Sequence, residues 1–342
     1  MANTEANRSK VEYALSPKGK HSDPFTDTFQ ESYVERNLET MFKSENLGFL
    51  DETSDLDSKM VKEFEENIEF SNGSYFVKLP WIDDKLAKVQ SNSNIALKVL
   101  ENVVNKLEKS NKYEDYVQVF LAQERDNIIE RIHVDPKNFD KYVWLPHRPI
   151  FKTEEQATTK VRPVFNASLK TKQGCSLNEA AYPGTNLLTD LLEILIKFRI
   201  DKNVLIGDIK QAFLRINLRE ETDKNLFCFF LKIKDKLICF RYKTLIFGFS
   251  SSPFILNYII KHHAKKYAED DCSKALLSNF YMDNLIITTN DLNKMENLYS
   301  ESKQRMLEGN FEMKYNSNSK ILNDKLIANG DYVQHGSDKE KV

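Results

Sequence analysis

The sequence has little of what a secreted, zinc-binding or membrane-spanning protein needs. Its four cysteines (Cys175, Cys228, Cys239 and Cys272) show no CxxC spacing, which argues against a zinc site and against a disulfide framework. We therefore expect reduced thiols in an intracellular protein. No apolar run approaches the roughly 18 residues of a membrane span, and the first residues lack the charged and apolar regions of a signal peptide. No membrane partner is predicted.

The sequence also lacks an excess of positive or negative charge. Lys and Arg number 49 and Asp and Glu number 51, so the formal net charge is only -2. Whole-chain charge thus makes no case for nucleic acid, and any basic surface must be local. One such segment is 141–172, which holds seven basic residues against two acids. The 342 residues, 41% of them hydrophobic, are enough for two or three domains with a substantial core.

The composition divides the chain into three regions. Residues 1–30 are polar, and we expect them to be disordered. Residues 31–140 predict a mainly helical region, and 141–342 mix strands with helices, so the predicted fold class is α+β with an antiparallel sheet. The expected strands are 142–145, 161–166, 203–209 and two arms within 226–242, and the expected helices cover 187–199, the residues after Pro253, and 291–308.

Two acids stand at the ends of predicted strands. The apolar run 204–207 leads directly into Asp208, and a second acid, Asp283, follows Tyr281 and Met282 between the apolar runs 276–280 and 285–289. The second pattern predicts a tight hairpin with Asp283 at its tip. Magnesium takes hard oxygen ligands, and a pair of metal ions suits nucleotidyl transfer. Judged alone, however, Asp208 could simply cap the end of a buried strand.

Further motifs surround these acids in a fixed order. They are Lys160-Val161-Arg162-Pro163-Val164-Phe165, Asp208-Ile209-Lys210-Gln211-Ala212-Phe213-Leu214 and Phe247-Gly248-Phe249-Ser250-Ser251-Ser252-Pro253, with Trp144-Leu145-Pro146-His147-Arg148-Pro149 and Ser176-Leu177-Asn178 in support. In this order the motifs resemble the fingers and palm of reverse transcriptases. Among reverse transcriptases, the motifs are most similar to those of the Pao/BEL group of long-terminal-repeat retrotransposons. The resemblance covers roughly residues 40–320.

The resemblance implies a fold and an activity. The fold would be a right-hand polymerase with fingers and an antiparallel palm sheet in 141–342, preceded by the mainly helical region. The activity would be RNA-directed DNA polymerisation, in which dNTPs are added to an RNA or DNA template-primer. Asp208 and Asp283 would hold two Mg²⁺ ions, for which Mn²⁺ could substitute. Asn284 stands at the catalytic position where a second acid is usual.

The resemblance also implies a dNTP-binding set. Lys160 and Arg162 would grip the triphosphate, Gln211 and Ala212 would line its sugar and phosphate side, and Phe213 would exclude a ribose 2′-hydroxyl. Phe247 and Gly248 would pack against the nucleotide and template, and Lys314 would lie near the leaving phosphate.

Each of these roles has a plainer alternative. Phe213 could be a core residue, Lys160 and Arg162 could belong to a solvated strand face, and a lone lysine such as Lys314 is usually a surface residue. The adjacent His262 and His263 have no acid or cysteine at ligand spacing, so we predict surface or core positions for them rather than a metal site.

Two departures from the family pattern bear on activity. An amide at Asn284 brings no charge to a metal pair. Only 28 residues follow Lys314, so we expect most of the thumb and the RNase H region to be missing, as in a truncated fragment of the polyprotein. The alternative hypothesis is therefore an inactive nucleic-acid-binding remnant that keeps the basic segment 141–172. Neither template preference nor oligomeric state is predicted.

Overall fold

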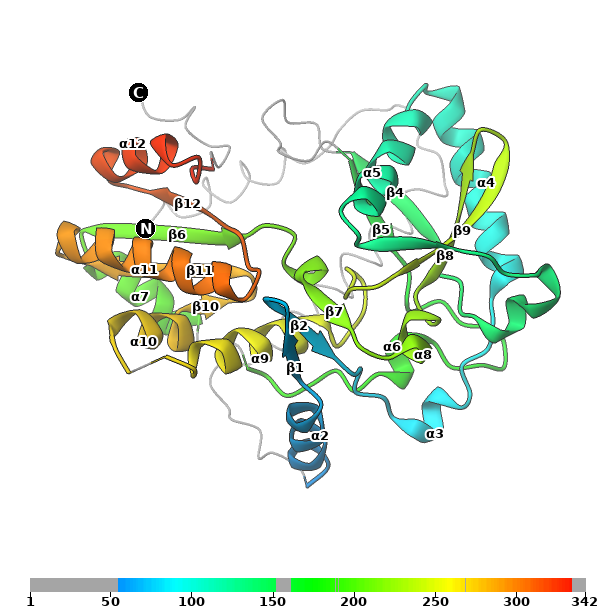
Figure 1. Cartoon of the computed structure of the whole chain (residues 1–342), viewed down its shortest axis with the longest axis horizontal. Helices are drawn as coiled ribbons and strands as arrows, with labels where there is room; N and C mark the ends of the chain where they lie inside the picture. The colour runs from blue at the N-terminus through cyan, green and yellow to red at the C-terminus, as the bar shows by residue number, and fades with distance from the viewer. Residues whose placement is uncertain (1–54, 152–160, 188, 190, 268, 334–342) are drawn as a thin grey trace, which may run out of the picture. The chain divides into compact units, whose positions relative to one another are not determined.

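The computed structural model describes residues 55–151, 161–187, 189, 191–267 and 269–333 (Figure 1). The chain divides into residues 1–51 and residues 52–342, and all of the described residues belong to the second unit. The predicted disorder of 1–30, the start of the helical region and Lys160 therefore lie outside the described residues. The described part combines helices with small, mainly antiparallel sheets, which confirms the predicted mixed class.

A four-stranded antiparallel sheet carries both acids. Its order is β10 (Phe280–Tyr281), β11 (Asn284–Thr289), β6 (Asn203–Ile209) and β12 (Met313–Ser317). Burial alternates from residue 205 to residue 209 of β6. Leu205, Gly207 and Ile209 are buried, whereas Ile206 and Asp208 are half-buried. One face of this sheet therefore packs on the core and the other face presents Asp208.

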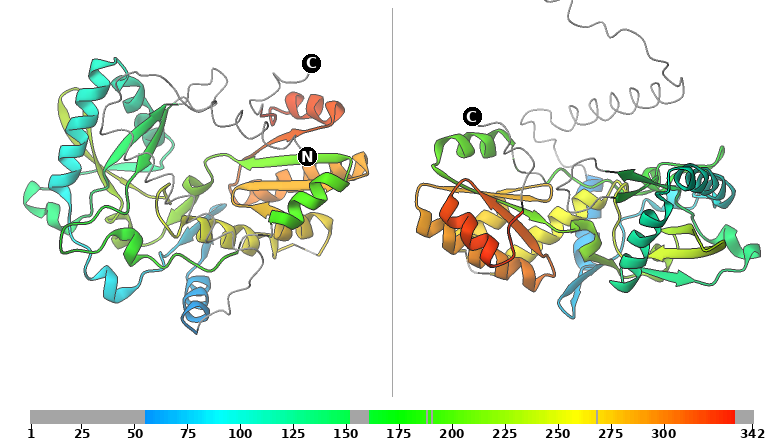
Figure 2. Two further views of the ribbon diagram at one scale, coloured as in Figure 1. Left: turned by 180° about the vertical axis from the view of Figure 1, so that it is seen from behind. Right: turned by 90° about the horizontal axis from the view of Figure 1, so that it is seen from above.

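Helices cover the buried face of this sheet. The long helix α11 (Leu292–Glu308) packs against β6, β11 and β12, and α10 (Asp271–Ser278) lies between α11 and α9 (Ser252–Ala264). A further helix, α7 (Leu191–Ile200), contacts β11, and the views in Figures 1 and 2 show it on the side of the sheet opposite α11. The side chain of Asp291 caps α11 by accepting hydrogen bonds from the backbone N–H groups of Asn293 and Lys294.

The remaining strands form three smaller sheets. Their orders are β1 (Glu69–Ser71), β2 (Ser74–Val77) and β7 (Ile216–Leu218); β3 (Ile129–Ile132), β9 (Lys236–Tyr242) and β8 (Cys228–Ile233); and β4 (His147–Phe151) with β5 (Val161–Phe165). The other helices are α2 (Asp55–Glu66), α3 (Asp83–Leu86), α4 (Ser93–Lys109), α5 (Tyr113–Arg125), η1 (Pro136–Lys141), α6 (Leu177–Ala180), η2 (Ala212–Arg215), α8 (Glu221–Lys224) and α12 (Lys320–Ala328).

A buried histidine links three of these elements. His147, at the start of β4, is 4% exposed and packs among Phe120, Phe165 and Phe229. Its Nδ1 lies 2.6 Å from the hydroxyl of Tyr116 in α5, and its Nε2 lies 2.8 Å from the carbonyl oxygen of Phe230 in β8. Burial lowers the pKa of His147 to about 4, so its imidazole is neutral at physiological pH.

The local predictions succeed along most of the described residues, although the helix expected over 187–199 begins only at Leu191, and they fail at two places. The strand at 203–209, the hairpin within 226–242 and the helix that ends before Gly309 are confirmed. The predicted strand at 142–145 is wrong, because Trp144 makes only an isolated bridge to Cys228 and buries its ring in a stack on Phe230 at 3.9 Å between ring centroids.

The second failure concerns the first arm of the predicted hairpin at 276–289. Residues 276–278 belong to α10, and only Phe280–Tyr281 pairs with β11. Leu276 is fully buried inside that helix. A short apolar run fits a buried helix as well as a strand, so the pattern alone could not separate the two.

Candidate active site

Strand register brings the two predicted catalytic segments together. Asp208 in β6 faces Asn284 in β11 across the antiparallel pair, and the backbone N–H of Ile209 donates to the carbonyl oxygen of Asp283 at 3.3 Å. Residues directly opposite each other project to the same face, with Cβ atoms about 5 Å apart. The end of β6 and the tip of the hairpin therefore form one half-buried acidic corner of the sheet.

The hairpin tip holds its carboxylate with the neighbouring amide. Tyr281 pairs with Asn284, so Met282 and Asp283 are the two central residues of the turn. Met282 has a φ of 57°, which is unusual for a residue with a side chain and suits the first position of a tight hairpin turn. The Nδ2 of Asn284 donates to the Oδ1 of Asp283 at 3.1 Å. Asn284 thus orients one oxygen of that carboxylate instead of adding a second charge.

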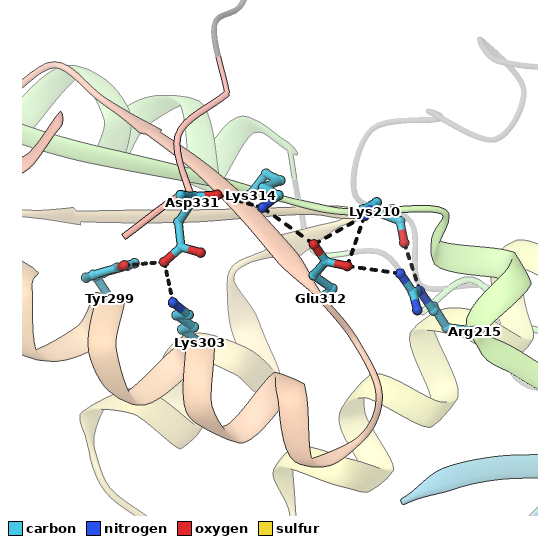
Figure 3. A network of polar contacts seen from close by, with 8 residues as sticks. Lys210, Arg215, Tyr299, Lys303, Glu312, Lys314 and Asp331 are labelled. Atoms are coloured by element: carbon cyan, nitrogen blue, oxygen red, sulfur yellow. Dashed lines mark hydrogen bonds and ion pairs between the residues drawn. The ribbon is translucent and has the colours of Figure 1, made fainter. Parts of the chain in front are cut away.

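Lys314 approaches the same corner from the other neighbouring strand. It faces Asp208 across the antiparallel pair of β12 and β6. Its Nζ donates to the carbonyl oxygen of Gly330 at 2.7 Å and lies 3.4 Å from the Oε1 of Glu312 (Figure 3). Lys314 is therefore a held side chain on the sheet face that carries Asp208, and not a freely extended surface lysine.

Three residues of the predicted dNTP-binding set meet in one cluster. The rings of Phe213 and Phe247 lie 4.6 Å apart between centroids and nearly perpendicular, at 71°. The guanidinium carbon of Arg162 lies 5.6 Å from the centroid of the Phe247 ring. Phe247 is 43% exposed, whereas Phe213 is partly buried against the core. The structure thus joins β5, η2 and the loop before α9 into an aromatic surface with a cation at its edge.

The loop that carries Phe247 has a sequence requirement at Gly248. This residue has a φ of 96°, and a Cβ built on it would lie 2.5 Å from the carbonyl oxygen of Phe165. Asn178 then holds the loop, because its Nδ2 donates to the Gly248 carbonyl oxygen at 2.9 Å and its Oδ1 accepts from the backbone N–H of Ser250 at 2.9 Å. No role for Asn178 follows from the sequence beyond its place within the Ser176–Asn178 motif.

The turn between Asp208 and Phe213 contains the other two predicted nucleotide contacts. Gln211 is exposed and has a φ of 57°, in the left-handed region. The side chain of Ala212 is buried, so it packs beneath the turn. Elsewhere, His263 is a core residue whose Nδ1 lies 2.8 Å from the Tyr75 hydroxyl and whose Nε2 lies 2.7 Å from the Arg305 carbonyl oxygen.

The acidic corner offers oxygen atoms, which are the ligand atoms that magnesium prefers. Within the described ranges, no group of three or more His, Cys, Asp or Glu side chains could hold a metal ion. The donors that the strand register places at this corner are the side chains of Asp208, Asp283 and Asn284. Magnesium prefers oxygen ligands and keeps several of its waters, so two carboxylates are chemically adequate ligands. The corner nevertheless has one negative charge fewer than a site with three acids.

Comparison with known proteins gives one family match for this part of the chain. Residues 147–321 match the family model described as reverse transcriptase (RNA-dependent DNA polymerase), and this stretch includes Asp208, Asp283 and Lys314. A search of curated proteins found no match. One similar solved structure is that of the foamy viral protease-reverse transcriptase in complex with double-stranded DNA, at 13% sequence identity and a TM-score of 0.43.

That alignment covers 56% of this chain and 28% of the foamy viral chain. The present chain thus corresponds to well under two thirds of that protein's length. Among the helices in the described part of the chain, none is long and apolar enough to cross a membrane.

Proposed function

Since the chain belongs to the reverse transcriptase (RNA-dependent DNA polymerase) family, we propose that it adds dNTPs to a primer on an RNA or DNA template. Residues 141–342 would supply the fingers and palm of a right-hand polymerase. The ordered motifs around Asp208 and Asp283 favour an origin in a Pao/BEL-type retrotransposon. The region before residue 141 would be the helical part that precedes this domain in the element's polyprotein.

The observation that carries this proposal is the register of the sheet. Asp208 lies opposite Asn284 on one side and opposite Lys314 on the other, and Asp283 occupies the turn next to Asn284. Two carboxylates and a lysine therefore share one corner, although they come from three separate segments. This is the arrangement that nucleotidyl transfer needs, because its catalysis depends on positioning and charge neutralisation rather than on covalent chemistry.

The side chains around the corner have complementary tasks in this proposal. Asp208 and Asp283 would hold two magnesium ions, which when bound would activate the primer 3′-hydroxyl and stabilise the leaving pyrophosphate. Arg162 would bind the triphosphate with its planar guanidinium. Phe213, braced by Phe247, would occupy the space of a ribose 2′-hydroxyl and so favour dNTPs over NTPs.

Primer extension tests the proposal directly. The purified chain is given an oligo(dT) primer on poly(rA), labelled dTTP, and either Mg²⁺ or Mn²⁺. We expect incorporation by the native chain and its loss in Asp208→Asn, a change that keeps the side-chain shape and removes the charge. Incorporation that is unchanged in Asp208→Asn would show that the metal assignment is wrong.

A second function is favoured by Asn284. If the missing charge abolishes catalysis, the fold would remain as a nucleic-acid-binding remnant that uses the basic segment 141–172. Such a protein would bind template-primer with a log affinity that falls linearly with log salt, and it would incorporate no nucleotide. Filter binding over a salt series, run beside the extension assay, distinguishes the two functions.

A further inference from the structure

One carboxylate ties three cations together beside the candidate active site. Glu312, just before β12, has its side-chain oxygens 3.1 and 3.3 Å from the Nζ of Lys210 and 3.2 Å from the Nη2 of Arg215. The Nζ of Lys314 lies 3.4 Å away. Figure 3 shows the Glu312 carboxylate between Lys314 on one side and Lys210 with Arg215 on the other.

The cations come from segments with different tasks. Lys210 and Arg215 bracket the turn that presents Gln211, Ala212 and Phe213, whereas Lys314 faces Asp208 from β12. Backbone contacts reinforce the connection: the N–H of Lys210 donates to the carbonyl oxygen of Glu312 at 2.9 Å. In addition, the Nε of Arg215 donates to the carbonyl oxygen of Lys210 at 3.2 Å, which closes the turn on itself.

The carboxylate carries its charge in this setting. Partial burial raises the pKa of Glu312, but the ammonium groups of Lys210 and Lys314 outweigh that effect and the pKa is lowered overall. The side chains of Arg215 and Lys314 are partly sheltered, at 22% and 29% exposed, whereas that of Lys210 is 50% exposed. Hydrogen bonds between charged groups are stronger and more directional than neutral ones, so they can fix the positions of these groups.

We propose that Glu312 is a positioning residue that couples the Lys210–Arg215 turn to Lys314. Through the turn it sets where Phe213 meets the nucleotide sugar, and through Lys314 it sets where a cation meets the leaving phosphate. The inference rests on the proposed polymerase function. It assigns Glu312 two separable effects, one on nucleotide binding through the turn and one on the chemical step through Lys314.

Hydrogen exchange tests the structural half of the inference without turnover. In Glu312→Gln the side chain keeps its shape and loses its charge, so we expect the amides of 210–215 to exchange several-fold faster. The matched control is Glu296→Gln, which removes a similar ion pair, between Glu296 and Lys325 at 2.7 Å, away from the site. The control should leave exchange at 210–215 unchanged. Equal exchange in Glu312→Gln and the native chain would overturn the inference.

Primer-extension kinetics test the functional half. We expect Glu312→Gln to lower kcat/KM for dTTP about tenfold, with a loss in kcat and a rise in KM, whereas Glu296→Gln should match the native chain. In a Lys314→Met background, Glu312→Gln should no longer lower kcat but should still raise KM. Independent losses in the double variant would overturn the coupling to Lys314, and partial recovery in Glu312→Asp would support a role of the charge.

The two arms separate this inference from the proposed function. A native chain that incorporates no nucleotide, even with Mn²⁺, counts against the polymerase. The exchange experiment still decides whether Glu312 holds the turn, because it is measured on the folded chain alone.

Discussion

At the scale of single residues, Asn284 affects both the charge of the acidic corner and the orientation of the Asp283 carboxylate. Its side chain donates a hydrogen bond to the Asp283 carboxylate at 3.1 Å. The amide can therefore orient this carboxylate, as groups that hydrogen-bond to metal ligands commonly do. It cannot supply charge. In three-acid sites the second acid of the turn adds one negative charge. Among the described residues at this corner, Asp208 and Asp283 are the carboxylates that would balance divalent ions.

We therefore predict that Asn284→Asp increases nucleotide incorporation about 10- to 100-fold at limiting Mg²⁺. The reason is the added charge beside Asp283, which raises affinity for the metal. The measurement is primer extension over a Mg²⁺ titration, with Asn284→Ala as the control that removes the hydrogen bond without adding charge. If Asp and Ala variants behave alike, the charge is not what limits the native chain.

A second prediction at the scale of single residues concerns the effect of a side chain at Gly248 on stability. Its φ of 96° and the 2.5 Å approach of the Phe165 carbonyl oxygen to a built Cβ both oppose a side chain. We expect Gly248→Ala to lower the free energy of unfolding by about 3 kcal/mol. Gly73→Ala is the control, because Gly73 has a φ of 72° with nothing within 4 Å, so only the backbone term of about 1 kcal/mol applies. The free energy of unfolding is measured by chemical denaturation. Equal losses in the two variants would mean that the Phe165 carbonyl oxygen moves away from the new methyl group and that no clash remains.

At the scale of elements, His147 joins α5, β4 and β8. Its two ring nitrogens contact the Tyr116 hydroxyl and the Phe230 carbonyl oxygen. Burial of the ring outweighs the Phe230 hydrogen bond and favours the neutral imidazole. The folded-state pKa of about 4 lies below the ordinary value of 6.5. The unfolded chain therefore takes up this proton first as the pH falls.

The stability contribution of His147 should thus be complete above pH 6.5 and lost progressively down to about pH 4. Between pH 7 and pH 5 we expect a loss of about 2 kcal/mol from this residue. The measurement is urea unfolding at several pH values, compared with His147→Gln, whose stability should be lower at pH 7 but flatter over this interval. A His147→Gln chain with the native pH slope would assign the titration to other groups, such as His263, whose pKa is also lowered.

At the scale of the whole molecule, the net charge of -2 leaves nucleic-acid binding to local surfaces. The ribbon of β4 and β5 offers one, because its register puts Arg148 and Arg162 on the same exposed face. Basic residues of 141–172 are not equivalent, however. All three of Arg148, Lys170 and Lys172 are exposed, but Lys170 is paired with Glu179 at 2.6 Å, whereas Arg148 and Lys172 form no ion pair with another described residue.

We predict that Arg148→Gln reduces the slope of log affinity against log salt by about 0.7 to 0.9, the value for one lost phosphate contact. Lys170→Gln should change it much less, because Glu179 holds that ammonium. Both variants are compared by fluorescence anisotropy with a labelled template-primer from 50 to 200 mM salt. A larger effect of Lys170→Gln would show that the ion pair opens to bind the backbone.

The sequence by itself predicted the parts that depend on neighbours in the chain. The apolar run before Asp208, the turn at Met282 and Asp283, and the hairpin within 226–242 follow from alternation and turn chemistry, which are local properties. Local patterns failed where they were ambiguous. Trp144 looked like a strand residue but is buried by stacking on Phe230, and Leu276 looked like part of a strand but lies in a buried helix.

Only the tertiary structure decided which distant residues meet. Alternation along β6 says that Asp208 faces away from the core, but it does not say that Asn284 and Lys314 are its neighbours. That depends on strand order and register, which long-range packing sets, because a shift of one residue would turn each side chain to the other face. Glu312 shows the same limit most clearly. The sequence around Glu312 indicates no role for it. Its importance arises because folding brings Lys210, Arg215 and Lys314 within reach of one carboxylate.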